Sequence, residues 1–498
     1  MRGRRRSLRA LHVAAELYPW VKTGGLGDVV AALPPALLEE GVDARLCLPG
    51  FPQLLDAFSL SDAVRLATPF AAERVRVAIA ALPGSNVGAY LVDHPAFYDR
   101  PGGPYGGPDG RDWPDNHRRF GLLSWVAAAL GQGADPSWRP DVVQAHDWHA
   151  GLAPAYLRAA GSPTPSIFTI HNLAYQGYFA AGIFPELSLP GSFFSIDGVE
   201  FFGGLSFLKA GLFYADRLTT VSPTYAREIQ TPDFGEGLEG LLRARGESLT
   251  GILNGVDPRY WDPEHDDAIP VAYGVDGAEA GKAAAKAELR RRLGLDDRPG
   301  PLFGVVSRLT PQKGLDLLLA ALPDLVASGG QLALLGGGDH DLEAGFRDAA
   351  TAQRGAIGAE IGYDERLSRL VIAGADCVVV PSRFEPCGLT QLYALRYGAL
   401  PLVRRTGGLA DTVVEATPAR LADGTATGFT FDAPTPEALA ATLEWAAAVY
   451  ANRPHWRQMM RQAMTRDFSW AQSARRYVSL YRELAAAWRP ELDGNPRP

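Results

Sequence analysis

The chain contains 498 residues, of which 47% are hydrophobic and 21% are charged, and its formal net charge is -8. This length suits two domains of roughly 200–250 residues, and the composition is that of an ordinary globular enzyme. The acidic balance excludes a general attraction to nucleic acid or to anionic membranes, so an anionic ligand requires a local cluster of cations.

The first nine residues contain five arginines and lead directly into a strand predicted over residues 10–16. Because no apolar segment follows them, we expect no secretory signal there, and we expect residues 1–9 to be a disordered basic extension or the result of a mis-assigned start. No later run is long and apolar enough to span a membrane.

The three cysteines, Cys47, Cys377 and Cys387, are too few and too scattered for a disulfide framework. They favour a reducing, cytoplasmic location. None has the neighbouring Cys or His residues of a zinc site, so we expect no structural metal.

Short runs that are apolar on both faces alternate with longer helical stretches, and the clearest of them are 142–145, 166–170, 302–306 and 377–380. Such runs are typical of parallel strands covered by helices on both sides. Because the pattern occurs twice, the sequence predicts an α/β protein with two Rossmann-like, doubly wound domains facing across a cleft.

The predicted domains are residues 1–254 and 255–469, with a hinge near Asn254. A last helix, within residues 470–498, is expected to cross back onto the first domain. Since doubly wound domains bind ligands beyond the carboxyl ends of their strands, the chemistry should lie in loops that directly follow predicted strands.

The first such loop is Lys-Thr-Gly-Gly-Leu-Gly-Asp at residues 22–28, before a helix predicted over 29–40. Its glycines and the helix N-terminus would let backbone N–H groups approach an anion. The glycine spacing does not match the dinucleotide fingerprint. A purely structural helix cap is the alternative, but Lys22 favours a diphosphate or sugar site.

Two histidine-containing loops follow the strands at 142–145 and 166–170. The His-x-x-His pattern at 146–149 suggests a metal, but two ligands are too few, and we favour a carbohydrate subsite. There Asp147 would bind sugar hydroxyls and Trp148 would stack on a pyranose. His171 could be a satisfied core residue, but its place at a strand end favours a contact with the transferred sugar.

In the second half, Arg308 and Lys313 lie in one loop after the strand at 302–306. Together they could neutralise a leaving diphosphate without a metal, although a solvated surface pair is the alternative. Asp339 and Asp341 form an Asp-x-Asp sequence of the kind that can hold a divalent metal, but we interpret Asp339 as a helix cap.

The most specific segment is 382–391, where Pro386 and Gly388 would restrict Glu385 at the start of a helix. The N–H groups of Leu389 and Thr390 would face a phosphate there. The alternative is that Glu385 only caps its own helix.

Over residues 11–484 the chain closely resembles the bacterial glycogen synthases and plant starch synthases. The motifs that carry this resemblance are Lys22-Thr23-Gly24-Gly25-Leu26, His146-Asp147-Trp148-His149, His171-Asn172-Leu173-Ala174-Tyr175-Gln176-Gly177, Leu253-Asn254-Gly255-Val256-Asp257 and the runs 381–391 and 404–413.

The resemblance implies a GT-B type fold and a cytoplasmic hexosyltransferase of glycogen biosynthesis. Such an enzyme transfers glucose from ADP-glucose to the non-reducing end of an α-1,4-glucan with retention of configuration. It implies no cofactor, no obligatory metal, and no nucleic-acid or membrane partner. The alternatives are UDP-glucose as donor, a small acceptor, or a glucan-binding protein without catalysis.

The resemblance also implies roles by position, with Glu385 beside the reacting sugar, Tyr363 against the adenine and Asn254 on the hinge side of the site. The implied catalytic residues are Glu385, Lys22, His171, Asp147, Arg308 and Lys313. Those implied to bind ADP-glucose are Lys22, Gly24, Gly25, Asp28, Asn254, Arg308, Lys313, Tyr363, Cys387, Gly388, Leu389 and Thr390, and those implied to bind glucan are Trp148 and Tyr175.

Overall fold

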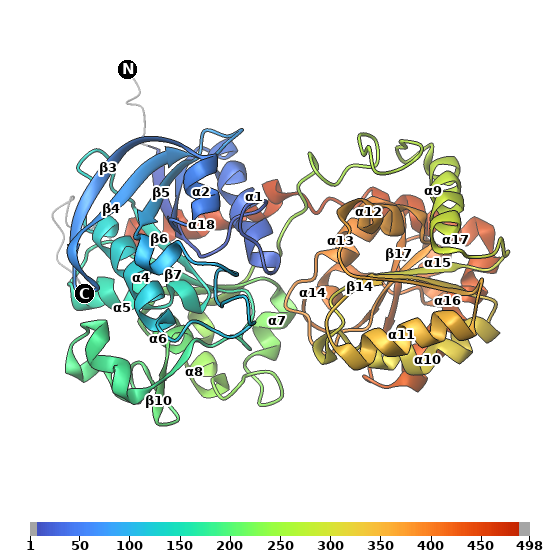
Figure 1. Ribbon diagram of the computed structural model, residues 1–498. Helices are drawn as coiled ribbons and strands as arrows, with labels where there is room; N and C mark the ends of the chain where they lie inside the picture. Colours follow the sequence, from blue (N-terminus) through green and yellow to red (C-terminus); the bar gives the residue numbers. More distant parts are fainter. Residues whose placement is uncertain (1–6, 488–498) are drawn as a thin grey trace, which may run out of the picture. The chain divides into compact units, whose positions relative to one another are not determined.

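The computed structural model describes residues 7–487, which form two compact units (Figure 1). Within that range unit 1 runs to Gly255 and resumes at Trp470, and unit 2 is Val256–Ser469. The chain therefore leaves unit 1 next to Asn254. In the described range no helix is both long and apolar enough to cross a membrane.

Unit 1 is built on a nine-stranded sheet with the order β12-β11-β7-β6-β1-β2-β5-β4-β3. Its pairs are parallel except β3–β4 and β4–β5, which form an antiparallel edge. In chain order the strands are β1 (Leu8–Val13), β2 (Val42–Pro49), β3 (Ser59–Thr68), β4 (Ala71–Ala81), β5 (Gly88–Asp93), β6 (Val142–His146), β7 (Ser166–Ile170), β11 (Arg217–Thr220) and β12 (Leu249–Gly251).

A separate three-stranded sheet in unit 1 has the order β8-β10-β9. Its strands are β8 (Tyr178–Ala180), β9 (Glu200–Phe201) and β10 (Gly204–Ser206). The helices of unit 1 are α1 (Gly25–Glu39), α2 (Pro52–Ala57), α3 (Pro95–Tyr98), α4 (Asn116–Gly131), α5 (Leu152–Ala159), α6 (Phe207–Tyr214), α7 (Pro223–Glu228), α8 (Glu239–Ala244) and α18 (Trp470–Ala487). Neither the small sheet nor the antiparallel edge was predicted from the sequence.

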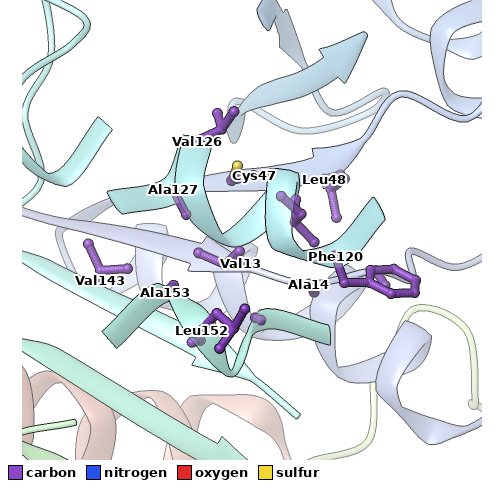
Figure 2. Close-up of a cluster of buried hydrophobic side chains, with 14 of the residues drawn as sticks. Val13, Ala14, Cys47, Leu48, Phe120, Val126, Ala127, Val143, Leu152 and Ala153 are labelled. Atoms are coloured by element: carbon purple, nitrogen blue, oxygen red, sulfur yellow. The ribbon is translucent and has the colours of Figure 1, made fainter. Parts of the chain in front are cut away.

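Both faces of the large sheet are buried because side chains alternate along each strand. Val143 points to the core under α4 and α5, where it lies near Ala153 (Figure 2). Its neighbour Val142 joins the opposite core, beneath α1 and α18, which contains Leu33 and other buried residues. This two-sided burial explains why the strands are continuously apolar in the sequence.

The start of unit 1 differs from the prediction in three ways. Strand β1 begins at Leu8, so the extension predicted as residues 1–9 is too long, and residues 1–6 lie outside the described part of the chain. The strand ends at Val13 rather than at Glu16. Helix α1 begins at Gly25, one turn before the predicted Val29, because the carboxylate of Glu16 holds the backbone that enters the helix.

Unit 2 is built on a six-stranded parallel sheet with the order β15-β14-β13-β16-β17-β18. Its strands are β13 (Leu302–Val306), β14 (Gln331–Gly336), β15 (Ile357–Ile361), β16 (Cys377–Val380), β17 (Leu400–Arg404) and β18 (Phe429–Phe431). Its helices are α9 (Ala278–Leu293), α10 (Leu315–Ala327), α11 (His340–Ala352), α12 (Glu365–Gly374), α13 (Thr390–Arg396), α14 (Gly407–Thr412), α15 (Pro418–Asp423), α16 (Pro436–Ala451) and α17 (Arg453–Met464). The strands predicted at 302–306 and 377–380 are confirmed.

Each large sheet contains a point where the strand order reverses. In unit 1 the first strand, β1, lies between β2 and β6, and in unit 2 the first strand, β13, lies between β14 and β16. Connections leave such a pair of strands in opposite directions, which creates a binding position at their carboxyl ends. The prediction of two doubly wound domains is therefore confirmed, and it places the loops after β1, β6, β13 and β16 at the two reversal points.

Candidate active site

The glycine-rich loop after β1 is organised by a buried carboxylate that the sequence analysis missed. Glu16 is 3% exposed and accepts hydrogen bonds from the N–H groups of Thr23 (2.8 Å) and Gly24 (3.2 Å). Its other oxygen accepts from the hydroxyls of Thr23 and Tyr105, both at 2.5 Å. Burial and then the Glu16 carboxylate raise the pKa of Tyr105 well above its usual value, so the phenol remains a donor. The loop is thus held in one conformation.

Lys22 and Asp28 of this loop form an ion pair at the surface. The Lys22 Nζ lies 2.9 Å from Asp28 Oδ1 and 4.8 Å from the centre of the Tyr18 ring. The Lys22 side chain is 37% exposed, so the pair contributes little to stability. A cation in this position is available to a ligand. The space beside Gly24 is open, since a Cβ added there would have no other atom within 4 Å.

Asp147, directly after β6, is 6% exposed and has φ 54° and ψ −174°, a strained backbone conformation that is rare for residues other than glycine. One carboxylate oxygen accepts from the backbone N–H of His171 at 2.7 Å and of Asn172 at 3.4 Å. Desolvation by burial raises the pKa of Asp147 to about 7, against the lowering effect of these two hydrogen bonds. Asp147 therefore fixes the loop after β7.

His171 is half-buried at the end of β7, and its Nε2 lies 2.9 Å from Nδ1 of His146. Burial lowers the pKa of His171 to about 3, so the imidazole is neutral at physiological pH. His149, the other histidine of the His-x-x-His pattern, instead stacks on Tyr105 with ring centres 4.5 Å apart. The two histidines of the pattern thus have different surroundings and do not form a metal site together.

The two aromatic residues predicted to bind glucan differ in availability. Trp148 is embedded among aromatic rings, including Phe120 at 4.9 Å, and a Cβ on Gly177 would lie 2.4 Å from its ring. Tyr175 is 51% exposed. Of the two, Tyr175 has the greater surface available for stacking on a sugar.

In unit 2, Lys313 and Glu385 form an ion pair between the loops after β13 and β16. Lys313 Nζ lies 2.6 Å from Glu385 Oε2, and the side chains are 18% and 9% exposed. The same oxygen accepts from Ser382 Oγ at 2.9 Å. No side chain in the described range caps α13, so the alternative that Glu385 only caps its own helix is wrong. The contacts with Lys313 and Ser382 leave the carboxylate little freedom.

The backbone around Glu385 is held by a glycine pair after β17. Gly407 has a φ of 45°, and a Cβ there would lie 1.9 Å from the carbonyl oxygen of Glu385. The N–H of Gly408 donates to that carbonyl at 3.2 Å, and its Cβ would meet the buried Cys387. Only glycine fits this approach, which explains the Thr-Gly-Gly sequence at 406–408.

Arg308 and Tyr363 are exposed at the carboxyl ends of β13 and β15. Arg308 forms no ion pair with any residue in the described range, unlike Lys313. Tyr363 is 78% exposed and donates to Glu365, and the N–H of Gly362 beside it donates to the carbonyl of Gly336. A cation and an aromatic face thus lie at one edge of the sheet.

The remaining predicted residues occupy the ends of elements. Asn254 is buried where the chain leaves unit 1. Gly388, with a φ of 71°, and Leu389 precede Thr390, the first residue of α13. Asp339 accepts from the N–H groups at the start of α11, so its interpretation as a helix cap is confirmed.

Within each unit the predicted residues thus lie beyond the carboxyl ends of the strands. Those after β1, β6, β13 and β16 lie at the reversal points, whereas Asn254 follows the edge strand β12 and Tyr363 the edge strand β15. Among residues 7–487 one group has three ligand atoms close enough for a metal: Asp262, Glu264 and His265. Asp262 is already paired with Arg396 and with His265, both at 2.8 Å. These contacts satisfy the carboxylate without a metal.

Two family profiles match the chain. "Starch synthase catalytic domain" matches residues 9–244, and "Glycosyl transferases group 1" matches residues 286–463. The glycogen synthase of Serratia proteamaculans (strain 568) is 53% identical over 481 residues, which are 96% of this chain and all of the relative. The glycogen synthase of Yersinia pseudotuberculosis serotype O:1b (strain IP 31758) is 52% identical over 480 residues, with the same coverage.

Among solved structures, the catalytic domain of starch synthase IV from Arabidopsis thaliana, bound to ADP and acarbose, has a TM-score of 0.84. It is 31% identical and covers 96% of this chain and 100% of its own. Sucrose-phosphate synthase from Thermosynechococcus elongatus, 19% identical with a TM-score of 0.59 over 97% of this chain and all of its own, shares the fold alone.

Proposed function

Because the chain belongs to the glycogen synthase family and is a glucosyltransferase, we propose that its donor is ADP-glucose and its acceptor the non-reducing end of an α-1,4-glucan. The product would retain the α configuration of the donor. The observation that carries the assignment of a sugar nucleotide as donor is the pair of cations, Arg308 and Lys313, in the loop after β13, at a strand reversal. The solved relative bound to ADP supports the choice of nucleotide.

Breaking the bond between the anomeric carbon and the diphosphate develops negative charge on ADP and positive charge on the sugar. Arg308 offers a planar fork of donors with no ion pair in the described range, and Lys313 offers a second positive charge. Fixed cations aimed at a leaving group are usually the largest catalytic contribution. Tyr363 would provide the surface on which the adenine lies.

Glu385 is proposed to stabilise the positive charge that develops on the sugar. Its oxygen Oε2 is held by Lys313 and Ser382, and Gly407 and Gly408 fix its backbone. A carboxylate with so little freedom suits electrostatic stabilisation, so we assign it that role and not the role of a covalent nucleophile.

In unit 1, Lys22 and the glycine-rich loop are proposed to contact the donor, and His171 is proposed to contact the transferred glucosyl unit. Asp147 would act mainly by holding His171, because its carboxylate already binds that backbone. Tyr175, half-exposed, is proposed to stack on the glucan acceptor, with Trp148 supporting the same region.

The cytoplasm is the proposed location of this reaction. Cys47, Cys377 and Cys387 are all free and buried, which is usual for proteins of a reducing compartment.

The test is nucleotide release by the purified protein, with ADP-glucose or UDP-glucose as donor and with glycogen present or absent. We expect ADP release that depends on glycogen. UDP release instead would keep the reaction and overturn the donor, and silence with both donors from folded protein would favour a glucan-binding protein. Glu385→Gln, assayed in parallel, should bind ADP and release product far more slowly.

A further inference from the structure

Three histidines of unit 1 form a continuous hydrogen-bonded row that ends at His171. Nδ1 of His12 lies 3.1 Å from Nε2 of His146, and Nδ1 of His146 lies 2.9 Å from Nε2 of His171. They come from the adjacent strands β1 and β6 and from the residue that follows β7. Only His171 reaches the surface, since His12 and His146 are each 1% exposed.

The row continues into the C-terminal helix. Tyr481 of α18 is fully buried, and its hydroxyl lies 3.3 Å from Nε2 of His12. The same hydroxyl donates to the amide oxygen of Gln144, and the amide nitrogen of Gln144 donates to Thr169 Oγ1 at 2.8 Å. Helix α18 therefore contributes to a network whose other end is a predicted site residue.

The contacts define a direction for the protons. Tyr481 has one hydroxyl proton and gives it to Gln144, so its oxygen can only accept from Nε2–H of His12. A neutral imidazole has one N–H, which leaves Nδ1 of His12 as an acceptor for Nε2–H of His146. By the same step, Nδ1 of His146 accepts from Nε2–H of His171. Nδ1 of His171 is then without a proton.

Burial supports the neutral state that this reasoning requires. Desolvation lowers the pKa of His12 and of His171 to about 3, and it lowers the pKa of His146 well below its usual value.

We propose that Tyr481, His12 and His146 are positioning residues that hold His171 as the Nε2–H tautomer, so that its Nδ1 accepts a hydrogen bond from a hydroxyl of the transferred sugar. This rests on the proposed contact between His171 and the glucosyl unit. A buried tyrosine on the last helix thereby decides whether a site residue acts as acceptor or donor.

The first test reads the tautomers without any substrate. In protein labelled with ¹⁵N-histidine, two-bond ¹H–¹⁵N correlation spectra distinguish protonated from bare ring nitrogens. We expect Nε2–H for His12, His146 and His171, assigned from single His→Gln variants. Tyr481→Phe removes the acceptor at the end of the row and would leave the Nε2–H of His12 buried and unpaired. Because a buried nitrogen without a proton is better tolerated than a buried unpaired N–H, we expect the three histidines to change to the Nδ1–H tautomer or to populate both tautomers.

The matched control is Tyr156→Phe, which removes a buried hydroxyl that donates to the carbonyl of Leu187. It removes one buried hydrogen bond in the same unit, whereas Tyr481→Phe removes two, so both variants should melt at lower temperature than the wild type, with the larger loss in Tyr481→Phe. The tautomers should change in Tyr481→Phe alone. Wild-type His171 with a proton on Nδ1, or unchanged tautomers in Tyr481→Phe, overturns the proposal.

The second test is kinetic and uses a double-mutant cycle. We expect Tyr481→Phe to lower kcat about five- to tenfold, as for loss of one well-formed hydrogen bond, while Tyr156→Phe leaves it unchanged. In a His171→Ala background, Tyr481→Phe should have no further effect, because it acts only through His171. Additive losses of kcat in the double variant, or altered tautomers with a normal kcat, overturn the positioning role. The proposed function fails only if the wild-type protein lacks glycogen-dependent turnover.

Discussion

The ion pair between Lys313 and Glu385 supports a quantitative prediction. Lys313→Met removes the charge and keeps the apolar stem, which leaves a carboxylate that is 9% exposed with Ser382 as its remaining hydrogen-bond donor. Removing one partner of a buried pair costs about 3–5 kcal/mol, because the other charge remains uncompensated. Since the Lys313 side chain keeps 18% exposure, we expect the low end, about 3 kcal/mol.

For a domain of this size, each 1 kcal/mol lowers the melting temperature by about 2–4 °C, so unit 2 should melt about 6–12 °C lower in Lys313→Met. Differential scanning calorimetry measures this shift. Arg308→Met is the matched control, because it removes an exposed cation of the same loop that makes no ion pair in the described range, and it should shift melting by less than about 2 °C.

Removal of both charges separates the ion pair from other effects of the substitution. In Lys313→Met/Glu385→Gln no uncompensated charge remains, so most of the lost stability should return. Both Lys313→Met and Arg308→Met should weaken ADP binding about tenfold or more in calorimetric titration, since each removes a charge-assisted contact. A Lys313→Met protein that melts like Arg308→Met, or additive losses in the double variant, would refute this account of how Glu385 is held.

Three further predictions follow from buried groups near the two strand reversals. Asp147→Asn keeps the acceptor for His171 on a side chain of the same size. Because burial raises the pKa of Asp147 from 3.8 to about 7, the wild type loses stability, up to about 4 kcal/mol, as pH rises from about 4 to 7. The melting temperature of Asp147→Asn should therefore gain on wild type between pH 5 and pH 8, and a constant difference would contradict the assignment. Gly407→Ala should destabilise unit 2 by more than about 2 kcal/mol in denaturant unfolding and should lower kcat, because the added Cβ would lie 1.9 Å from the Glu385 carbonyl oxygen. Gly424→Ala is the control, since Gly424 also has a positive φ but its added Cβ would meet only the end of the Gln458 side chain. This control should lose less stability and keep a normal kcat. Glu16→Gln replaces a carboxylate, which only accepts hydrogen bonds, with an amide whose NH₂ would face N–H and O–H groups. We expect the free energy of unfolding to fall by about 2 kcal/mol and the sugar nucleotide to bind more weakly. An unchanged Michaelis constant for the sugar nucleotide would count against a role for the glycine-rich loop.

The sequence by itself determined the elements and the loops in which chemistry should lie. Strands such as 302–306 and 377–380 were predictable to the residue, because a strand buried on both faces must be continuously apolar over a short length. The rule that parallel strands present their carboxyl ends to ligands then pointed to the loops of Arg308 and Glu385 without knowledge of the pairing order. These are local patterns, and local patterns can be recognised in the sequence without the tertiary structure.

Only the tertiary structure decided which side chains in those loops meet. Glu16 and Tyr105 share a hydrogen bond across 89 residues, Lys313 and Glu385 an ion pair across 72, and His12 and Tyr481 a contact across 469. No spacing in the sequence marks such partners, because the chain brings them together through the strand order and through the return of α18. The boundary error at Val29 arose because the Glu16 carboxylate, and not the helix propensity of the residues, holds the backbone where α1 begins.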